Sequence, residues 1–145
     1  KGKNGFSHQG GGIQLRVIVP SEGRFFDEEA IDMLVKTRFT VSQQSDRMGY
    51  RLATVTPIKQ TENREIMSCV TFMGSIQLPP SGEPILLMAD HQTTGGYPQI
   101  ASVITADLSL AGQLAPGDWV EFTVCSRREA VEALVLQEEK ILAVC

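Results

Sequence analysis

Cysteine is scarce in this chain and shows none of the spacings that bind metals. The 145 residues include three cysteines, Cys69, Cys125 and Cys145, and two histidines. No Cys-x-x-Cys or paired Cys/His pattern occurs, and an odd number of cysteines is a poor disulfide framework. We therefore expect no metal site. Cys69 and Cys125 lie in apolar runs, where a free cysteine behaves as a small buried hydrophobic side chain.

An excess of positive charge and long apolar runs are also lacking. The net charge is −4 and the arginines are scattered, whereas a nucleic-acid-binding domain normally carries a basic face. Apolar runs such as Ile85 to Ala89 fall far short of the roughly 18 residues that a membrane-spanning helix needs. With no secretory leader and little cysteine, we expect a cytoplasmic protein that binds neither nucleic acid nor membrane.

A Walker-type phosphate loop is absent as well, since no lysine follows the Gly95-Gly96 pair. Two adjacent glycines after two threonines can turn consecutive N–H groups to one side and hold an anion or a carbonyl oxygen. The same pair is also typical of a tight turn between two strands. Both interpretations stay open on the sequence alone.

What is present indicates one mainly β domain. Residues 1–12 are Gly-rich and aperiodic, as in a linker, and residues 13–145 are long enough to bury a core. Short β-branched or alternating runs bounded by Gly and Pro predict strands. We expect them at residues 15–19, 39–41, 66–72, 76–78, 85–89, 100–106, 119–124 and 141–144. Helices are predicted at 26–36 and after a Ser126-x-x-Glu129 capping box. This pattern favours a closed or nearly closed β-barrel covered by about two helices.

Two polar clusters interrupt the strands. The first, Gln43 to Arg47, precedes Gly49, and its arginine offers a planar fork suited to a carboxylate or a phosphate. The second, Asp90 to Thr94, precedes the glycine pair. Arg47 can equally make a weak surface pair in a solvated turn, and Asp90 can cap a turn by accepting backbone N–H bonds.

Three motifs resemble one known family. They are Gln44-Ser45-Asp46-Arg47-Met48-Gly49-Tyr50-Arg51-Leu52, Gly74-Ser75-Ile76-Gln77-Leu78-Pro79-Pro80, and Leu87-Met88-Ala89-Asp90-His91-Gln92-Thr93-Thr94-Gly95-Gly96-Tyr97-Pro98. The residues of these motifs and the order of the motifs resemble those of the biotin-dependent carboxyltransferase family. This family includes the C subunit of 5-oxoprolinase, also called allophanate hydrolase subunit 2 or KipA-like protein. The resemblance runs from about residue 15 to 142 and covers the C-terminal half of a usual member. Two departures stand out: His91 replaces the usual Arg, and Ser68-Cys69-Val70-Thr71 replaces the usual Ser-Glu-Gly-Val.

The resemblance implies a cyclophilin-like barrel and a hydrolase subunit that opens 5-oxo-L-proline to L-glutamate in an ATP-dependent complex. The expected partners are homologues of the A and B subunits of 5-oxoprolinase, the N-terminal half of the family member, and a small amide substrate. ATP is expected to bind elsewhere in the complex. The alternatives are a carboxyltransferase acting on urea-derived amides, which alone would need biotin, and a non-catalytic KipA-like regulatory module.

The predicted site combines the two polar clusters with the family motifs. We assign catalytic roles to Arg47, Asp90 and His91. Substrate-binding roles are assigned to Gln44, Ser45, Asp46, Tyr50, Gln77, Gln92, Thr93, Thr94, Gly95, Gly96 and Tyr97. Arg47 would clamp a carboxylate or phosphate, the backbone at residues 94–96 would donate N–H groups, and Asp90 would transfer a proton with His91 or Gln92 nearby.

Overall fold

A computed structural model describes residues 12–19, 28–45, 49–58, 69–70, 72–88, 94–95 and 97–144. Within these ranges the elements follow the order β1 (Gly12–Ile18), α1 (Glu28–Lys36), β2 (Phe39–Val41), β3 (Gly49–Ala53), β4 (Cys69–Val70), β5 (Ser75–Gln77), β6 (Ile85–Leu87), β7 (Thr94–Gly95), β8 (Gln99–Val103), a 3-10 turn η1 (Thr105–Asp107), α2 (Leu108–Ala111), β9 (Trp119–Val124) and α3 (Arg127–Val144).

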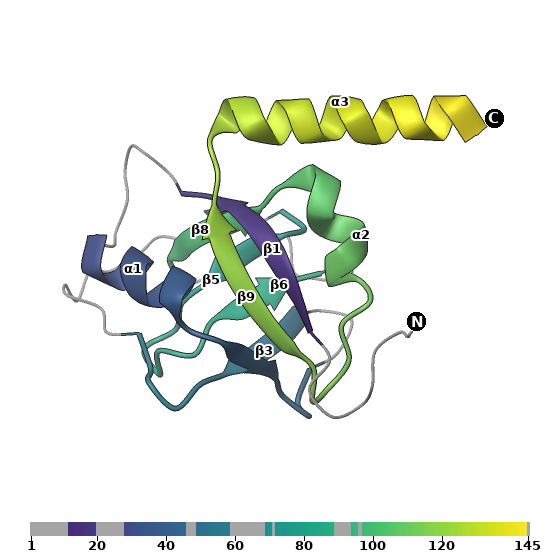
Figure 1. Ribbon diagram of the computed structural model, residues 1–145. Coiled ribbons are helices and arrows are strands. Elements are labelled where there is room, and N and C mark those ends of the chain that lie inside the picture. Colours follow the sequence, from purple (N-terminus) through teal and green to yellow (C-terminus); the bar gives the residue numbers. More distant parts are fainter. Residues whose placement is uncertain are drawn as a thin grey trace.

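Seven strands close into a barrel in the order β1-β8-β5-β6-β3-β2-β9, and the closing pair, β1 with β9, is parallel. The other pairs in the barrel are antiparallel. Two short strands, β4 and β7, pair with each other outside it. The expectation of a mainly β, closed barrel with a cyclophilin-like fold is thus confirmed (Figure 1).

The barrel interior is filled by side chains that alternate along the strands. In β1 Leu15 and Val17 are fully buried between outward-facing neighbours, and β9 contributes Phe122, whose ring lies 5.9 Å from that of Phe39. The largest enclosed side chains are Phe39, Phe122, Leu15, Leu34, Leu52, Ile58, Ile76, Leu78, Leu86 and Ile100. This core holds the strand ends from which the candidate site would be built.

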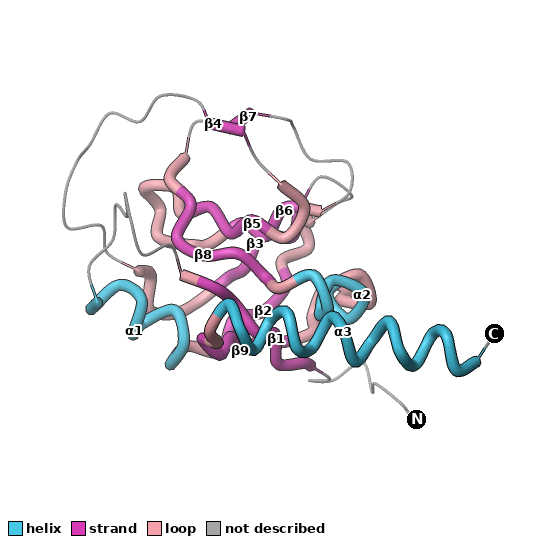
Figure 2. Tube along the Cα trace, turned by 90° about the horizontal axis from the view of Figure 1, so that it is seen from above, coloured by secondary structure: helices cyan, strands magenta, loops and turns pink. Residues whose placement is uncertain are grey.

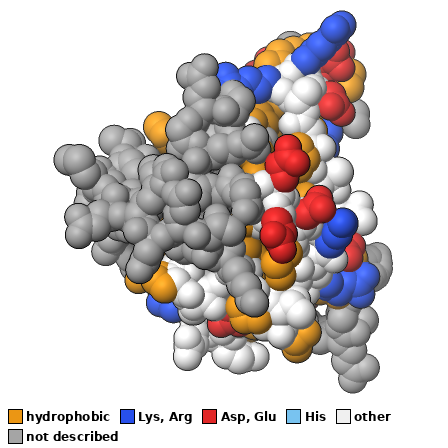
Figure 3. All heavy atoms as spheres, turned by 90° about the vertical axis from the view of Figure 1, so that its left-hand side faces the viewer, with side chains coloured by type: hydrophobic (Ala, Val, Ile, Leu, Met, Phe, Trp, Pro, Cys, Tyr) orange, Lys and Arg blue, Asp and Glu red, His pale blue; other side chains and the backbone are white. Residues whose placement is uncertain are grey.

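Helix α1 covers one side of the barrel because its sequence is amphipathic. Ala30 and Leu34 are buried, while Glu28, Glu29 and Asp32 are exposed. The two glutamates lie in the first turn, where the helix dipole favours negative charge. Acidic side chains accordingly gather on this face of the molecule (Figure 3).

Several predicted boundaries were wrong. Strand β1 begins at Gly12 rather than Leu15 because Gly12 pairs with Trp119 and lies under its ring, where a Cβ would come 2.0 Å from a ring carbon. The predicted strand at 141–144 is instead the end of α3. The short α2 was not predicted, so the described residues contain three α-helices rather than two.

Other predictions are confirmed in detail. Strand β9 has the predicted bounds, and the predicted strands at 76–78 and 85–89 correspond to β5 and β6, which pair antiparallel. The capping box is complete, since Glu129 N–H donates to Ser126 Oγ (3.0 Å) and Ser126 N–H donates to Glu129 Oε1 (3.1 Å). Cys125 is buried and free, and burial raises the pKa of its thiol. Separately from these predictions, no helix in the described part of the chain is long and apolar enough to span a membrane.

Candidate functional site

The strand ends that flank both polar clusters meet at one end of the barrel. The first cluster leads directly into β3 at Gly49, and the second follows β6, which ends at Leu87. Gly49 and Leu87 are register partners in the antiparallel β3–β6 pair. Asp46, Arg47, Asp90, His91, Gln92, Thr93 and Gly96 themselves lie outside the described residues. The two polar segments are therefore joined to the barrel next to adjacent residues, Gly49 and Leu87. The roles assigned to the side chains in these segments stay predictions.

This end of the barrel is tightly packed through glycine. Gly74 adopts a φ of 95° and donates its N–H to the carbonyl oxygen of Leu87 at 2.8 Å. A Cβ on Gly74 would lie 2.8 Å from Leu108 Cδ2, and one on Gly49 would lie 2.9 Å from the Leu86 carbonyl oxygen. The Gly49, Gly74 and Leu87 backbones thus form a close-packed rim that a side chain would disrupt.

The small β4–β7 sheet lies outside the barrel, beyond β5 and β6 and on the side away from β1 and β9 (Figure 2). Cys69 pairs with Gly95, and Val70 pairs with Thr94. This ladder brings the segment that departs from the family pattern against the Thr-Thr-Gly-Gly motif. The substitution near Cys69 and the glycine motif are therefore neighbours in space although 25 residues separate them in sequence.

Gln44 and Ser45 form part of a hydrogen-bonded turn between β2 and β3. Gln44 N–H donates to Ser42 Oγ at 3.1 Å, and Arg51 N–H donates to Ser45 Oγ at 2.9 Å. The Ser45 side chain therefore stabilises the turn, which fits the alternative interpretation of this segment as a solvated turn. Gln44 also borders a small cavity of about 90 Å³ that Arg51 and Glu83 help to line.

Tyr50, Gln77 and Tyr97 occupy three different environments. Tyr50 is half-buried against the core, and burial together with the nearby charge of Asp118 raises the pKa of its phenol, so it is a hydrogen-bond donor rather than a base at neutral pH. Gln77 is 6% exposed and pairs with Ile85 in β6 and Gln99 in β8. Tyr97 is 44% exposed. Nothing in their described contacts joins these three side chains to one another.

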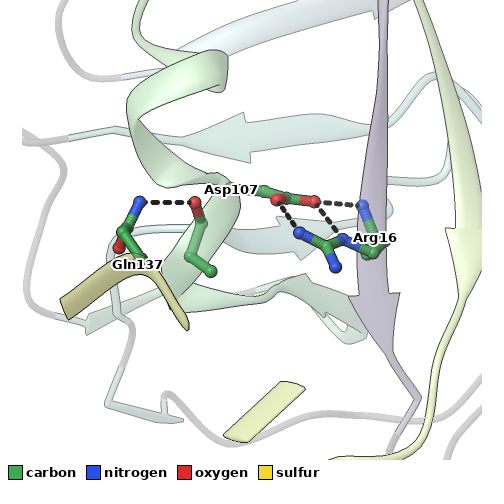
Figure 4. A network of polar contacts seen from close by, with 4 residues as sticks. Arg16, Asp107 and Gln137 are labelled. Carbon is green, nitrogen blue, oxygen red and sulfur yellow. Dashed lines mark hydrogen bonds and ion pairs between the residues drawn. The ribbon is translucent and has the colours of Figure 1, made fainter. Parts of the chain in front are cut away.

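A polar network that sequence reasoning missed lies under α3 (Figure 4). Both the backbone N–H (2.9 Å) and the Nε (3.0 Å) of Arg16 donate to Asp107 Oδ2, and Arg16 Nη2 donates to Oδ1 at 2.6 Å. Burial alone would raise the pKa of Asp107, but the hydrogen bonds and positive charge of Arg16 outweigh it and lower the pKa below 3.8. Gln137 Nε2 donates to the Ala106 carbonyl oxygen at 3.0 Å, which joins α3 to η1.

The network borders a groove of about 380 Å³ between α3 and the η1–α2 segment. Its lining is Arg16, Ala106, Asp107, Ser109, Leu110, Ala133, Leu136 and Gln137. None of these is a predicted site residue, and the carboxylate and guanidinium in it already satisfy each other. We interpret the network as structural. A charged residue inside the β-branched run of β1 was the one sequence signal that could have pointed to it.

The fold agrees with comparisons with known proteins. Residues 3–124 match the family described as "Carboxyltransferase domain, subdomain A and B". The chain therefore belongs to this carboxyltransferase family.

Two bacterial relatives both bear the name of the C subunit of 5-oxoprolinase. The protein of Escherichia coli (strain K12) is 40% identical over 122 residues, 84% of this chain and 39% of its own length. The Haemophilus influenzae protein is 41% identical over 118 residues, 81% of this chain and 38% of its own length. This chain thus spans about two-fifths of the curated relatives that it matches.

Solved structures extend the likeness to urea-processing enzymes. The urea carboxylase of Kluyveromyces lactis superposes with a TM-score of 0.79 at 26% identity, over 88% of this chain and 12% of that one. The urea amidolyase of the same organism gives the same TM-score and identity, over 88% of this chain and 8% of that one. In both, a barrel of this kind is one part of a much longer chain.

Proposed function

We propose that this chain is the barrel portion of a 5-oxoprolinase C subunit and contributes to the opening of 5-oxo-L-proline to L-glutamate in an ATP-dependent complex. The observation that carries the proposal is the 40–41% identity to two proteins of that name across the barrel. A putative urea carboxylase is 25% identical over a similar stretch. Sequence identity therefore favours the cyclic amide over urea as the substrate.

The chemistry of the substrate explains why polar clusters would be needed. Opening the ring breaks its amide C–N bond. A water oxygen becomes part of the new carboxylate, and the ring nitrogen gains both water protons and becomes an ammonium group. Because an amide is unreactive, the site must stabilise negative charge on the carbonyl oxygen and supply or remove protons in place. A clamp for the substrate carboxylate would also fix the orientation of the ring.

In this proposal Arg47 binds the substrate carboxylate or a phosphate, because a guanidinium donates two parallel N–H bonds to such groups. Backbone N–H groups at residues 94–96 stabilise the developing oxyanion, and Asp90 transfers the proton. The pairing of Gly49 with Leu87 supports this arrangement, since it starts both polar segments from the same end of the barrel. ATP would bind another subunit, because the sequence has no Walker-type loop.

A carboxyltransferase is the second candidate function, favoured by the TM-score of 0.79 to a urea carboxylase. It would transfer a carboxylate from carboxybiotin to a urea-derived amide and would require a biotin carrier. A non-catalytic, KipA-like regulatory role is the third alternative. The three differ in which added components produce turnover.

One experiment separates them. The chain is joined to the N-terminal portion of a 5-oxoprolinase C subunit and co-purified with the A and B subunits, and ATP hydrolysis is measured with 5-oxoproline, urea or allophanate. The proposal predicts hydrolysis that depends on 5-oxoproline and on this chain. Turnover of urea only after addition of a biotin carrier would support the second function, and binding without any turnover would support the third.

A further inference from the structure

Helix α3 presents a face that the barrel does not cover. Among its residues whose side chains are described, none is fully buried, and Val131 (61%) and Val135 (47%) are exposed. The helix rests on the barrel side through half-buried Ala130, Ala133, Leu134 and Gln137. Its far side faces away from the barrel, and its C-terminal turns extend past α2 in both ribbon and tube views (Figures 1 and 2).

The exposed face carries a heptad-like stripe. Arg128, Val131, Val135 and Glu138 follow one another at spacings of three, four and three residues, which keeps them on one side of an α-helix. All four are exposed, and Arg128 also pairs with Glu132 of its own helix, with 3.2 Å between Nε and Oε1. The stripe is a short apolar centre with a cation at one end and an anion at the other. We call these four residues the α3 seam.

The α3 seam is complementary to itself when reversed. Arg128 lies three residues before Val131, and Glu138 lies three residues after Val135. In an antiparallel pairing that sets Val131 of one copy against Val135 of another, Arg128 therefore meets Glu138 at both ends. The same register sets Arg127 against Glu139. A two-fold interface needs this reciprocity, because each residue of the patch must find its partner within the same patch.

We infer that α3 is a self-association surface, and that its occupant is the α3 of a second copy of this chain. The apolar centre and the charge pattern both select this occupant, since a parallel copy would set Arg128 against Arg128. Pairing would also cover the exposed valines and stabilise a helix that gains little from its own barrel. The contact is small, so we expect a Kd of about 100 µM or tighter, at the weak end of specific interfaces.

Analytical ultracentrifugation of the 145-residue chain at increasing concentration tests the inference. The wild type should shift from monomer to dimer. Arg128→Glu and Glu138→Arg should each weaken association at least tenfold, because each sets like charges together at both ends. An equimolar mixture of the two variants should form a heterodimer, and the double variant Arg128→Glu/Glu138→Arg should dimerise again.

Lys36→Glu is the matched control, because it reverses one exposed charge on α1 and should leave association unchanged. Circular dichroism checks that each variant keeps its helix content. A wild type that stays monomeric up to about 1 mM, ten times the expected Kd, would overturn the inference. So would single variants that dimerise like the wild type, or a mixture and a double variant that fail to restore association.

Discussion

At the scale of single residues, the carboxylate of Asp107 is a buried charge held by a partner distant in sequence. Its side chain is 3% exposed, and Arg16, from a strand 91 residues earlier, holds it with three hydrogen bonds. A buried carboxylate is tolerated only when it is paired in this way. The pair ties β1 to the segment on which α3 rests, and no local sequence pattern could have predicted so distant a partner.

Asp107→Asn should destabilise the fold at pH 7 by about 2–3 kcal/mol, since it removes the charge that Arg16 pairs with. The folded-state pKa of Asp107 lies below its ordinary 3.8. Its stabilising effect is therefore complete above that value and is lost as the pH falls through the lower, folded-state pKa. Urea unfolding from pH 7 to pH 2 should show the difference between wild type and variant narrowing in acid. A constant difference would contradict this account.

Alanine substitution at three glycines distinguishes the energetic cost of backbone strain from that of a steric clash. Gly112 has a φ of −65° and room for a Cβ, Gly117 has a φ of 97° with room, and Gly74 has a φ of 95° without room. Replacement by alanine should be near neutral at Gly112 and cost about 1–2 kcal/mol at Gly117. At Gly74 it should cost about 2–4 kcal/mol because overpacking adds to the strain. Thermal or urea unfolding ranks the three, and an equal cost at Gly74 and Gly117 would contradict the packed rim.

At the scale of elements, strongly patterned segments were predictable and short apolar runs were not. Strand β9 alternates over six residues and has the predicted bounds, and the Ser126–Glu129 capping box forms as predicted. The run Ile141–Val144 was wrongly predicted as a strand, because four consecutive apolar residues fit either structure. In α3 the apolar side chains of Val135 and Leu136 are 47% and 58% exposed, so their apolar character alone does not mark the buried face of the helix.

The cap should matter for α3 because the helix buries so little of itself. Ser126→Ala should destabilise the start of α3 by about 1 kcal/mol, and amides of the first turns should exchange with solvent faster. Hydrogen exchange detected by NMR measures this directly. Ser126→Asp, which keeps a side-chain acceptor, should retain most of the protection. If alanine and aspartate behave alike, the capping interaction does not control the helix end.

At the scale of the whole molecule, strand count and turn spacing predicted a barrel but not the order in which its strands pair. Closure depends on β1 lying parallel to β9, a pairing across more than 100 residues, and local patterns carry no information about such partners. The candidate site, too, depends partly on local motifs and partly on a pairing between distant segments. The motifs indicate which residues take part, while the shared origin of the two polar segments follows from the pairing of Gly49 with Leu87.

The central claim is that these two segments form one site, and a double-mutant cycle in the reconstituted complex tests it most directly. Arg47→Ala and Asp90→Asn should each lower kcat/KM for 5-oxoproline-dependent ATP hydrolysis about 100-fold or more. Lys36→Ala, which removes an exposed cation of α1 away from both polar segments, should have little effect. If the two residues act on the same bound substrate, the double variant loses far less than the product of the two single losses. Strictly multiplicative losses, or single variants with wild-type rates, would contradict the claim.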